Sequence, residues 1–339
     1  MKINELPGSK CPYAISAGEG DRYTFGGQLS TVIARPEDTG GLLDLVIVSG
    51  GKGAAFPLHS HERAHESLYV LDGTLELYLE GKKYALVRGD FASIPPRSLH
   101  GYTMTSHRTQ VLWWAVDGDS TRIYAALGSK YDGYVHPADS GNEITSEKLR
   151  AAEKAADIQF SASRTAESGA WLTSPPAGKE SYVLGSGEGE RMIAGDQLFA
   201  FLAHQGNSDG KFISLTTIGP KGDKIPEHYH EKHTETFLCL DGLMTMWANG
   251  EELALRPGDF LHVPAGTVHA FRLDAHYTRF IGVLAPGLFE PFFRTLCDPY
   301  PNYIFPLQPW PFRFDRVLKK LPELDLKLVG GPPGGGPPR

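Results

Sequence analysis

Residues 51–73 read GKGAAFPLHSHERAHESLYVLDG, and a related segment recurs later in the chain. Residues 220–242 read PKGDKIPEHYHEKHTETFLCLDG, which places a second copy 169 positions further along the chain. The same offset carries AGEGDR (17–22) onto the related SGEGER (186–191). Because a single offset relates matching residues over a long part of the chain, the sequence indicates two copies of one fold.

Short alternating segments follow this stretch in both copies, separated by glycine and proline. They read LDGTLELYLEGKKYALVRGDFASIPP at 71–96 and LDGLMTMWANGEELALRPGDFLHVPA at 240–265. Alternation of apolar and polar residues between turn residues is typical of half-buried strands. The sequence therefore predicts an all-β protein made of two tandem jelly-roll barrels.

The domain division follows from the repeat and from the chain length, because 339 residues exceed what one compact core usually holds. We predict an N-terminal barrel domain at 1–144, a linker at 145–177, a C-terminal barrel domain at 178–329 and a disordered Gly/Pro tail at 330–339. The linker contains SEKLRAAEKAAD (146–157), a predicted helix with Ser146 as its cap. The apolar segment 287–317 is expected to pack across the barrels.

Composition and charge restrict the class of protein. Hydrophobic residues make up 41% and charged residues 22% of the chain, as in ordinary soluble globular proteins, and no apolar run is long enough to cross a bilayer. The first residues, MKINELPGSKCPYA, lack the apolar stretch of a secretory signal, so a cytoplasmic location is expected. Three widely spaced cysteines suit a reducing compartment without a structural disulfide.

A net charge of −7, with the basic residues scattered, argues against a nucleic-acid partner. No membrane partner is expected either. A small molecule is the expected partner.

Each copy carries three histidines and one glutamate at matching positions. Residues two apart on a strand share a face, so both histidines of each His-x-His can point into the barrel. The glutamate opens the next apolar run, and the third histidine follows a turn on a later strand. The predicted metal ligands are His59, His61, Glu66 and His100 in the first copy, and His228, His230, Glu235 and His269 in the second.

Three imidazoles and one carboxylate suit a borderline divalent ion such as iron, manganese, cobalt, nickel, copper or zinc. Four protein ligands leave positions open on a six-coordinate ion, as a catalytic metal requires. His65 and His233 lie beside the glutamates but do not share the offset, and we interpret them as residues outside the ligand set.

Apolar and aromatic residues share the predicted inward face with these ligands. By strand parity, Tyr102 and Phe271 follow the third histidine by two residues and face the cavity. The same parity places Leu68, Val70, Phe237 and Cys239 there. Such walls suit a flat aromatic substrate, so Tyr102, Leu68, Val70, Phe237 and Phe271 are candidate substrate-binding residues, although a simple barrel core would have the same pattern.

The spacing resembles the two motifs of the cupin superfamily. Gly, five residues, His-x-His, a short gap, Glu, six residues and Gly is filled from Gly53 to Gly73 and from Gly222 to Gly242. The second motif, Gly, five residues, Pro-x-Gly, two residues and His, is complete from Gly258 to His269. The first copy departs from it at Arg97, where glycine is usual, so its turn is expected to differ in shape.

Segments such as GDFLHVPAGTVH and VLAPGLFEPFFRTLCDPY resemble the bacterial two-cupin quercetin dioxygenases, and the likeness covers nearly the whole chain. The resemblance implies cleavage of the heterocyclic ring of a flavonol by O2, giving a depside (2-protocatechuoylphloroglucinol carboxylate) and carbon monoxide. It also implies a homodimer, no organic cofactor and one divalent metal per barrel, iron or manganese foremost, with cobalt, nickel or copper acceptable. In that chemistry Glu66 and Glu235 are the catalytic residues, each a ligand that also takes the proton of the 3-hydroxyl.

Two other functions stay open on the sequence. Another bicupin reaction, such as oxalate decarboxylation on manganese, would use the same ligands with an arginine beside a small pocket, and Arg97 is a candidate for it. A non-catalytic ligand-binding or storage bicupin is the third reading. Storage cupins have commonly lost their ligands, and this chain has kept all eight.

Overall fold

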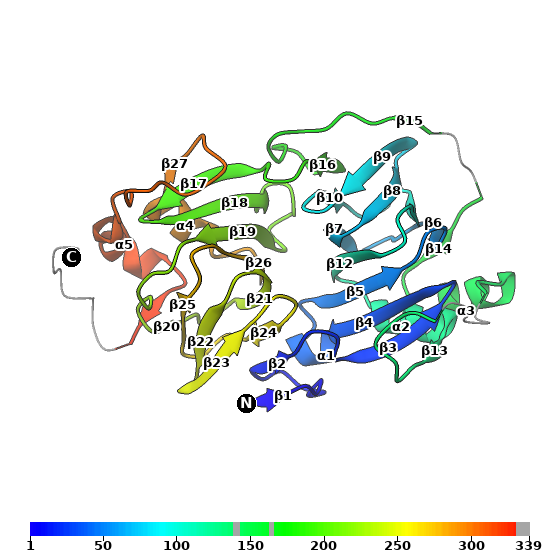
Figure 1. The fold of residues 1–339 in the computed structure, drawn as a ribbon, viewed down its shortest axis with the longest axis horizontal. Coiled ribbons are helices and arrows are strands. Elements are labelled where there is room, and N and C mark those ends of the chain that lie inside the picture. Colours follow the sequence, from blue (N-terminus) through cyan, green and yellow to red (C-terminus); the bar gives the residue numbers. More distant parts are fainter. Residues whose placement is uncertain (138–142, 163–165, 330–339) are drawn as a thin grey trace.

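A computed structural model describes residues 1–137, 143–162 and 166–329. It shows the two β-sheet copies side by side, with the N-terminal copy mainly blue to cyan and the C-terminal copy green through yellow to red (Figure 1). Each copy is built on two sheets. The predicted all-β fold of two tandem jelly rolls is confirmed.

The N-terminal copy is built, within the described residues, on an eight-stranded sheet and a six-stranded sheet. The larger sheet has the order β13 (Ser129–Lys130), β3 (Asp21–Phe25), β4 (Gln28–Ala34), β5 (Asp44–Gly50), β12 (Thr109–Val116), β7 (His65–Asp72), β10 (Phe91–Ile94) and β16 (Tyr182–Leu184). The smaller sheet has the order β14 (Gln159–Phe160), β6 (Ala55–Ser60), β11 (His100–Met104), β8 (Thr74–Leu79), β9 (Lys82–Val87) and β15 (Glu167–Ser168).

The C-terminal copy repeats this plan, in the described part of the chain, with a nine-stranded and a five-stranded sheet. The larger sheet has the order β1 (Lys2–Ile3), β2 (Tyr13–Ile15), β24 (Phe260–Val263), β21 (Thr234–Asp241), β26 (Thr278–Ala285), β19 (Ile213–Gly219), β18 (Gln197–Ala203), β17 (Glu190–Ala194) and β27 (Asp298–Pro299). The smaller sheet has the order β23 (Glu251–Leu255), β22 (Met244–Ala248), β25 (His269–Leu273), β20 (His228–Tyr229) and β28 (Lys327–Leu328).

The β8–β9 hairpin shows how the sequence sets these strands. Along β8 every second residue is buried, as the alternation of the sequence predicts. The two residues between the strands, Glu80 and Gly81, both have positive φ, 50° and 71°. Asn249 and Gly250 repeat this turn between β22 and β23 with φ of 48° and 83°. Two-residue hairpin turns of this kind need left-handed backbone and fix the register of the flanking strands.

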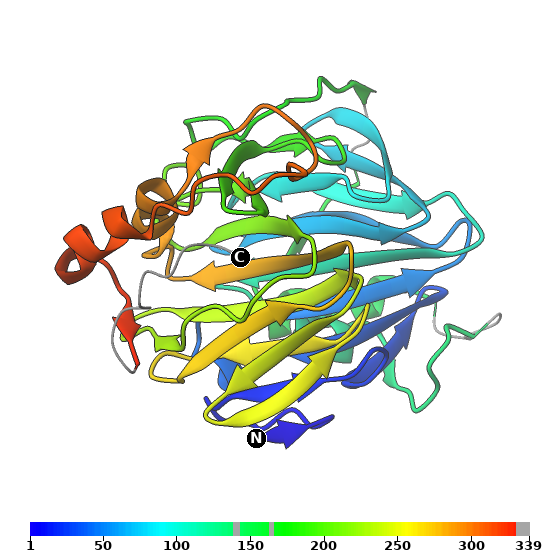
Figure 2. The same ribbon diagram turned by 60° about the vertical axis from the view of Figure 1, so that its left-hand side comes forward.

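The equivalent strands β2 and β16 each lie on the sheet of the other copy. β2 pairs with β24, Tyr13 opposite His262, and β16 pairs with β10, Tyr182 opposite Ser93. Figure 2 shows β1 and β2, in blue, beside the yellow strands of the C-terminal copy. Side chains from both copies form one buried cluster at this junction. The predicted division at residues 144 and 178 stays a prediction, and these exchanged strands cross it.

Helices are few and short. They are α1 (Pro36–Thr39), α2 (Ser120–Leu127), α3 (Ser146–Ala155), α4 (Glu290–Leu296) and α5 (Phe314–Lys320), followed by the 3-10 turn Leu321–Glu323. The linking helix α3 forms where the sequence predicts it, but the cap is Thr145, whose hydroxyl accepts from the Lys148 amide, and the prediction of Ser146 is wrong. No helix in the described ranges has the length and hydropathy needed to span a membrane.

The apolar segment 287–317 packs on the C-terminal copy instead of across both barrels. On α4, the ring of Phe293 lies 5.3 Å from that of Phe199 and 5.4 Å from that of Phe201. Phe305 contacts Tyr277 of the same copy. The expectation that this segment bridges the barrels is therefore corrected: its aromatic side chains cover one copy. The Gly/Pro tail at 330–339 lies outside the described residues.

Candidate metal centres

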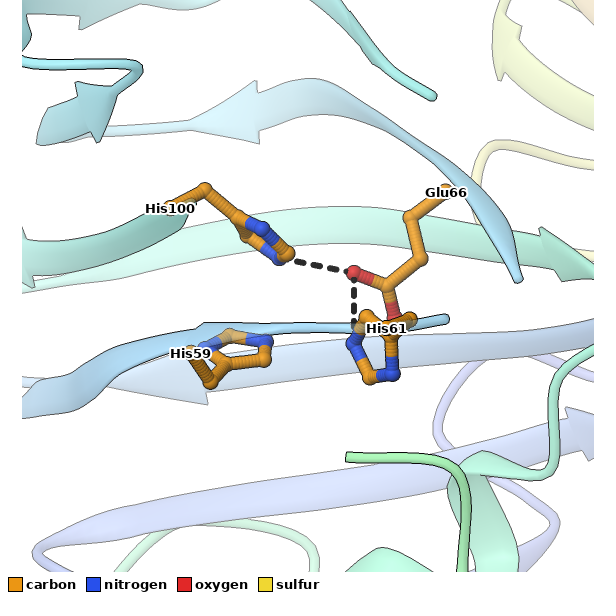
Figure 3. A group of neighbouring side chains, drawn as sticks. All are labelled: His59, His61, Glu66 and His100. Atoms are coloured by element: carbon orange, nitrogen blue, oxygen red, sulfur yellow. Dashed lines mark hydrogen bonds and ion pairs between the residues drawn. The ribbon is translucent and has the colours of Figure 1, made fainter. Parts of the chain in front are cut away.

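The N-terminal cluster is assembled by three strands. His59 lies near the end of β6, Glu66 near the start of β7, and His100 opens β11. Strands β6 and β11 pair with His59 directly opposite His100. One ligand atom from each of His59, His61, Glu66 and His100 lies within 4.8 Å of the others, and their side chains converge in Figure 3. The structure thus brings together the four residues predicted from the repeat.

Backbone carbonyls orient all three imidazoles. A carbonyl oxygen can only accept a hydrogen bond, so each Nδ1 in contact with one must carry a hydrogen. The other ring nitrogen, Nε2, then faces the cluster and is the atom left for a metal. The Nδ1–H groups of His59, His61 and His100 donate to the carbonyl oxygens of Pro57 (2.8 Å), Asp157 and Ser98 (2.9 Å), respectively.

The Glu66 carboxylate closes the N-terminal cluster. Its Oε2 lies 2.8 Å from Nε2 of His100 and 3.3 Å from Nε2 of His61. Burial favours the neutral acid, yet His61 and His100 outweigh it and hold the pKa of Glu66 well below its ordinary value. Burial and the neighbouring His100 hold the pKa of His59 well below its own ordinary value. A carboxylate held ionised beside a neutral imidazole is the form in which both bind a cation.

The C-terminal cluster repeats this construction. β20 and β25 pair with His228 opposite His269, and Nδ1 of these histidines donates to the carbonyls of Pro226 at 2.8 Å and Thr267 at 2.9 Å. Ligand atoms of His228, His230 and His269 form one close group within 4.8 Å. Burial and His269 lower the pKa of His228 to about 3, so this imidazole is neutral.

Glu235 belongs to a second, overlapping group, with His230 and His233. Its Oε2 lies 3.1 Å from Nε2 of His269, and its Oε1 lies 3.5 Å from Nε2 of both His230 and His233. Burial lowers the pKa of His233, but its bonds to Asp325 and Glu235 outweigh burial and raise it. The C-terminal centre thus has a fifth titratable group, where the N-terminal copy has Ala64.

Both clusters fit a metal ion by the chemistry of their donors. The Nε2 atoms of His61, His230 and His233 are buried, and each faces a carboxylate oxygen at 3.3–3.5 Å without a hydrogen bond of ordinary geometry among the described residues. Buried polar atoms without a partner are costly, and an ion coordinated by them removes that cost. Imidazole nitrogen and carboxylate oxygen are ligands that first-row divalent metals accept.

A cavity of about 920 Å³, including its open mouth, leads to the C-terminal cluster. His228, Glu235 and His269 line it, and Phe237 and Phe271 form part of its wall. Helix α4 and the segment after it add further rings, Phe289, Phe292, Phe293, Phe312 and Phe314. The wall is almost entirely apolar, which suits a flat aromatic molecule.

Comparison with known proteins places this architecture. A Cupin domain model matches residues 46–116 and 214–277. The quercetin 2,3-dioxygenase of Bacillus subtilis (strain 168) is 51% identical over 333 residues, which cover 96% of this chain and 98% of that protein. The chain belongs to the quercetin 2,3-dioxygenase family. The Aspergillus japonicus enzyme of the same name is 32% identical over 123 residues, 34% of this chain and 35% of that protein.

Solved structures support the fold of this family member. Oxalate decarboxylase from Bacillus subtilis aligns with a TM-score of 0.53 and 16% identity, covering 81% of this chain and 76% of that one. Salicylate 1,2-dioxygenase from Pseudoaminobacter salicylatoxidans aligns with a TM-score of 0.52 and 11% identity, covering 87% and 77%. At these identities the likeness concerns the fold alone.

The five candidate substrate-binding residues of this bicupin fall into two groups. Phe237 and Phe271 line the C-terminal cavity. Leu68, Val70 and Tyr102 belong to the buried core of the N-terminal copy, at 0%, 0% and 3% exposure. Their role in binding substrate stays a prediction.

The side chain of Arg97 lies in solvent, although its backbone contacts the predicted ligand His61. Its side chain is 75% exposed and donates from Nε to Glu62 at 2.8 Å. The turn keeps the shape of its counterpart, because Arg97 has φ of 70° and Gly266 has φ of 85°. Each amide donates at 2.6 Å to the carbonyl of the second histidine of its His-x-His pair. The expectation that this turn differs in shape is therefore wrong. Because the Arg97 side chain is exposed, it gives no support to an oxalate-type pocket beside the metal.

Two aspartates that support the clusters were missed in the sequence. Asp157 accepts hydrogen bonds from the amides of residues 62–64, and Asp325 accepts from those of residues 231–233. Their carbonyls hold His61 and His230. The two aspartates are 168 residues apart, one less than the ligands, so a search at the ligand offset passes over them. A search that allowed the register to slip by one residue would have found the pair.

Proposed function

We propose that this protein is a metal-dependent quercetin 2,3-dioxygenase, which opens the heterocyclic ring of a flavonol with O2 to give a depside and carbon monoxide. The observation that carries this function is the 51% identity to the Bacillus subtilis enzyme over 96% of the chain. The apolar cavity that is lined by His228, Glu235 and His269 supports a flat aromatic substrate.

One divalent ion per copy is part of the proposal, with iron or manganese as the first candidates. In the N-terminal copy His59, His61, Glu66 and His100 would hold it. In the C-terminal copy His228, His230, Glu235 and His269 would do so, with His233 beside Glu235. When bound, the ion would act as a Lewis acid that stabilises negative charge on the deprotonated substrate. No organic cofactor is required by the proposal.

The chain's own residues supply binding and proton transfer. The phenylalanine walls orient the flat substrate and exclude water from it. Glu235, which lines the cavity and is 7% exposed, accepts the proton of the substrate 3-hydroxyl on a carboxylate oxygen. His269, whose Nε2 lies 3.1 Å from that carboxylate, keeps it in place. Glu66 has the matching position in the N-terminal copy.

The direct test mixes metal-reconstituted protein with quercetin in air. The expected result is loss of the flavonol absorption with release of carbon monoxide, one molecule for each flavonol consumed. Reconstitution with iron, manganese, cobalt, nickel and copper in parallel would identify the metals that support turnover. An unchanged spectrum with every metal would refute the proposed activity. A cytoplasmic location and a homodimer complete the proposal, and gel filtration with light scattering tests the second.

A further inference from the structure

The two metal clusters differ in a residue that approaches the third histidine from the opposite sheet. Trp113 on β12 and Gly282 on β26 are separated by the repeat offset of 169. Their strand partners agree as well, because Trp113 pairs with Leu68 and Gly282 pairs with Phe237. The two positions are therefore structurally equivalent, with the largest side chain in one copy and none in the other.

Trp113 fills the space beside the N-terminal cluster. Its ring lies 6.3 Å from that of His100 and 5.6 Å from that of Tyr102, and Trp113 is only 7% exposed. Gly282 lines the C-terminal cavity. Its φ is not left-handed, and a Cβ there would meet its nearest atoms at 3.3 and 3.4 Å. The backbone would thus accept a side chain with a small adjustment, and the consequence of the glycine is open space.

A second replacement enlarges the same cavity. Phe25 in the N-terminal copy is fully buried and stacks on Tyr124, with ring centroids 5.0 Å apart. Its counterpart in the C-terminal copy is Ala194, which lines the cavity. The clusters themselves are about equally enclosed, since the exposed fraction is 12% for the Glu66 side chain and 9% for that of Glu235. The copies therefore differ in the room beside the ligands.

A polar pair in the N-terminal copy indicates which chemical group would fit the cavity of the C-terminal copy. In the N-terminal copy, Gln28 is fully buried, accepts the Tyr102 hydroxyl at 2.5 Å and donates to the Ala55 carbonyl at 3.0 Å. The counterparts of Gln28 and Tyr102 are Gln197 and Phe271, which both line the cavity. Phe271 has a ring but no hydroxyl.

Gln197 therefore lacks the partner that Gln28 has. Within the described ranges, the side-chain amide of Gln197 makes no hydrogen bond, although it opens into an almost wholly apolar cavity. When a ligand fills an apolar cavity, a polar group in its wall loses water, and this costs free energy unless the ligand supplies a hydrogen-bond donor for it. The group that satisfies the equivalent glutamine in the N-terminal copy is a phenol.

We propose that the C-terminal cavity is the flavonol-binding site and that Gln197 hydrogen-bonds a phenolic hydroxyl of the substrate, in the role that Tyr102 has toward Gln28. This inference rests on the proposed dioxygenase function. It identifies the copy that binds the flavonol and the side chain that recognises its phenolic hydroxyl. Trp113, Phe25 and the Tyr102–Gln28 bond fill the equivalent space in the N-terminal copy, so that copy has no room for a flavonol.

Two substrates and one pair of variants test the role of Gln197. Quercetin carries phenolic hydroxyls on its rings, whereas 3-hydroxyflavone carries only the 3-hydroxyl. In Gln197→Leu, loss of one hydrogen bond should lower kcat/KM for quercetin about 3- to 10-fold, chiefly through KM, and leave that for 3-hydroxyflavone within about 2-fold. Gln28→Leu is the matched control in the other copy and should leave the ratio of the two substrates unchanged.

Equal losses for both substrates in Gln197→Leu, or an altered ratio in Gln28→Leu, would overturn the assignment of Gln197. Wild-type protein that converts neither substrate would instead refute the dioxygenase function itself. The two failures are therefore distinguishable in one data set.

Gly282→Trp tests which copy binds the flavonol. Filling the cavity as Trp113 fills its counterpart should abolish quercetin turnover while two metal ions per chain remain by elemental analysis. Gly282→Ala should give a smaller loss. Full turnover in folded, metal-loaded Gly282→Trp would show that the flavonol binds elsewhere. If Gly282→Trp fails to fold, as far-UV circular dichroism would show, Gly282→Leu provides a smaller filling side chain with the same expected direction.

Discussion

His230 donates its Nδ1–H to the backbone carbonyl of Asp325 at 2.6 Å, while the Asp325 carboxylate accepts three amides from the turn after His230. One aspartate thus fixes both the ring of a ligand and the loop that carries it. Asp157 makes the equivalent contacts with His61 and its loop at the N-terminal centre. Because these contacts set the direction of Nε2, the metal affinity of each copy depends on a residue that does not touch the metal.

The first prediction concerns these aspartates. Asp325→Ala leaves three turn amides without their acceptor and loosens the segment whose backbone carbonyl holds His230. We expect metal affinity at the C-terminal centre to fall 10- to 100-fold, roughly the usual effect of removing a support of a ligand. Elemental analysis after dialysis at limiting metal should then approach one ion per chain. Asp325→Asn, which keeps one acceptor oxygen, should lie in between, and an unchanged stoichiometry in Asp325→Ala would contradict the role.

The second prediction concerns the two glutamates. Glu66→Gln combined with Glu235→Gln keeps side-chain volume and leaves all six histidines, so the fold should persist. The amide cannot accept the substrate proton as a carboxylate does, and turnover of quercetin should fall by about 10²- to 10⁴-fold. Stopped-flow absorption with metal content measured on the same sample separates loss of chemistry from loss of metal. A double variant that stays active with metal bound would exclude the carboxylates as bases.

Much of the site was predictable because it follows from strand periodicity. His59 and His61 share a face by alternation, and the offset that maps them onto His228 and His230 identifies their partners without any knowledge of the sheets. The structure then brings the four N-terminal candidates within 4.8 Å. Local spacing was sufficient here, because each ligand sits in or beside a regular strand.

The exchange of β2 and β16 between the copies was not predictable in this way. Periodicity identifies Tyr13 and Tyr182 as strand residues, but which sheet a short strand joins depends on long-range packing. The N-cap of α3 is Thr145 and not the predicted Ser146. Both residue types can cap a helix, and only the backbone geometry distinguishes the two positions. The filled space beside Trp113 and the cavity beside Gly282 could not be predicted from the sequence either. The size of a cavity depends on all of the residues that line it.

The third prediction uses the turn before His100. Arg97 has φ of 70°, a conformation that costs a residue with a side chain about 1–2 kcal/mol. Its ion pair with Glu62 is exposed on both sides, so its loss should matter little. Arg97→Gly should therefore raise the free energy of unfolding by up to about 1 kcal/mol after the entropy cost of glycine. Urea denaturation measures the change.

Gly266→Ala is the converse of Arg97→Gly at the equivalent turn, where φ is 85°. It should lower the free energy of unfolding by about 1 kcal/mol. A destabilised Arg97→Gly together with an unaffected Gly266→Ala would show that backbone strain does not govern these turns.

The fourth prediction concerns pH and the exchanged strand. His262 on β24 lies opposite Tyr13 of β2, and its Nδ1–H donates to the Cys11 carbonyl at 2.9 Å. Burial lowers the pKa of His262 to about 4, against an ordinary value of 6.5. Between these two values the unfolded chain binds the proton and the folded chain does not. The contribution of this group is therefore complete above pH 6.5 and is lost as the pH falls toward 4.

Acidification should accordingly release β2 from β24. Hydrogen exchange at the amides of residues 13–15 should speed up between pH 6.5 and 5 in the native protein, and the free energy of unfolding should fall over the same range. His262→Asn, which keeps a donor toward Cys11 and does not titrate, should flatten this slope. The exposed His107 provides the control, since His107→Asn removes a histidine far from the exchanged strand and should leave the slope unchanged. A slope that survives in His262→Asn would assign the acid sensitivity to another buried histidine, with His65 the next to test because burial lowers its pKa to about 4 as well.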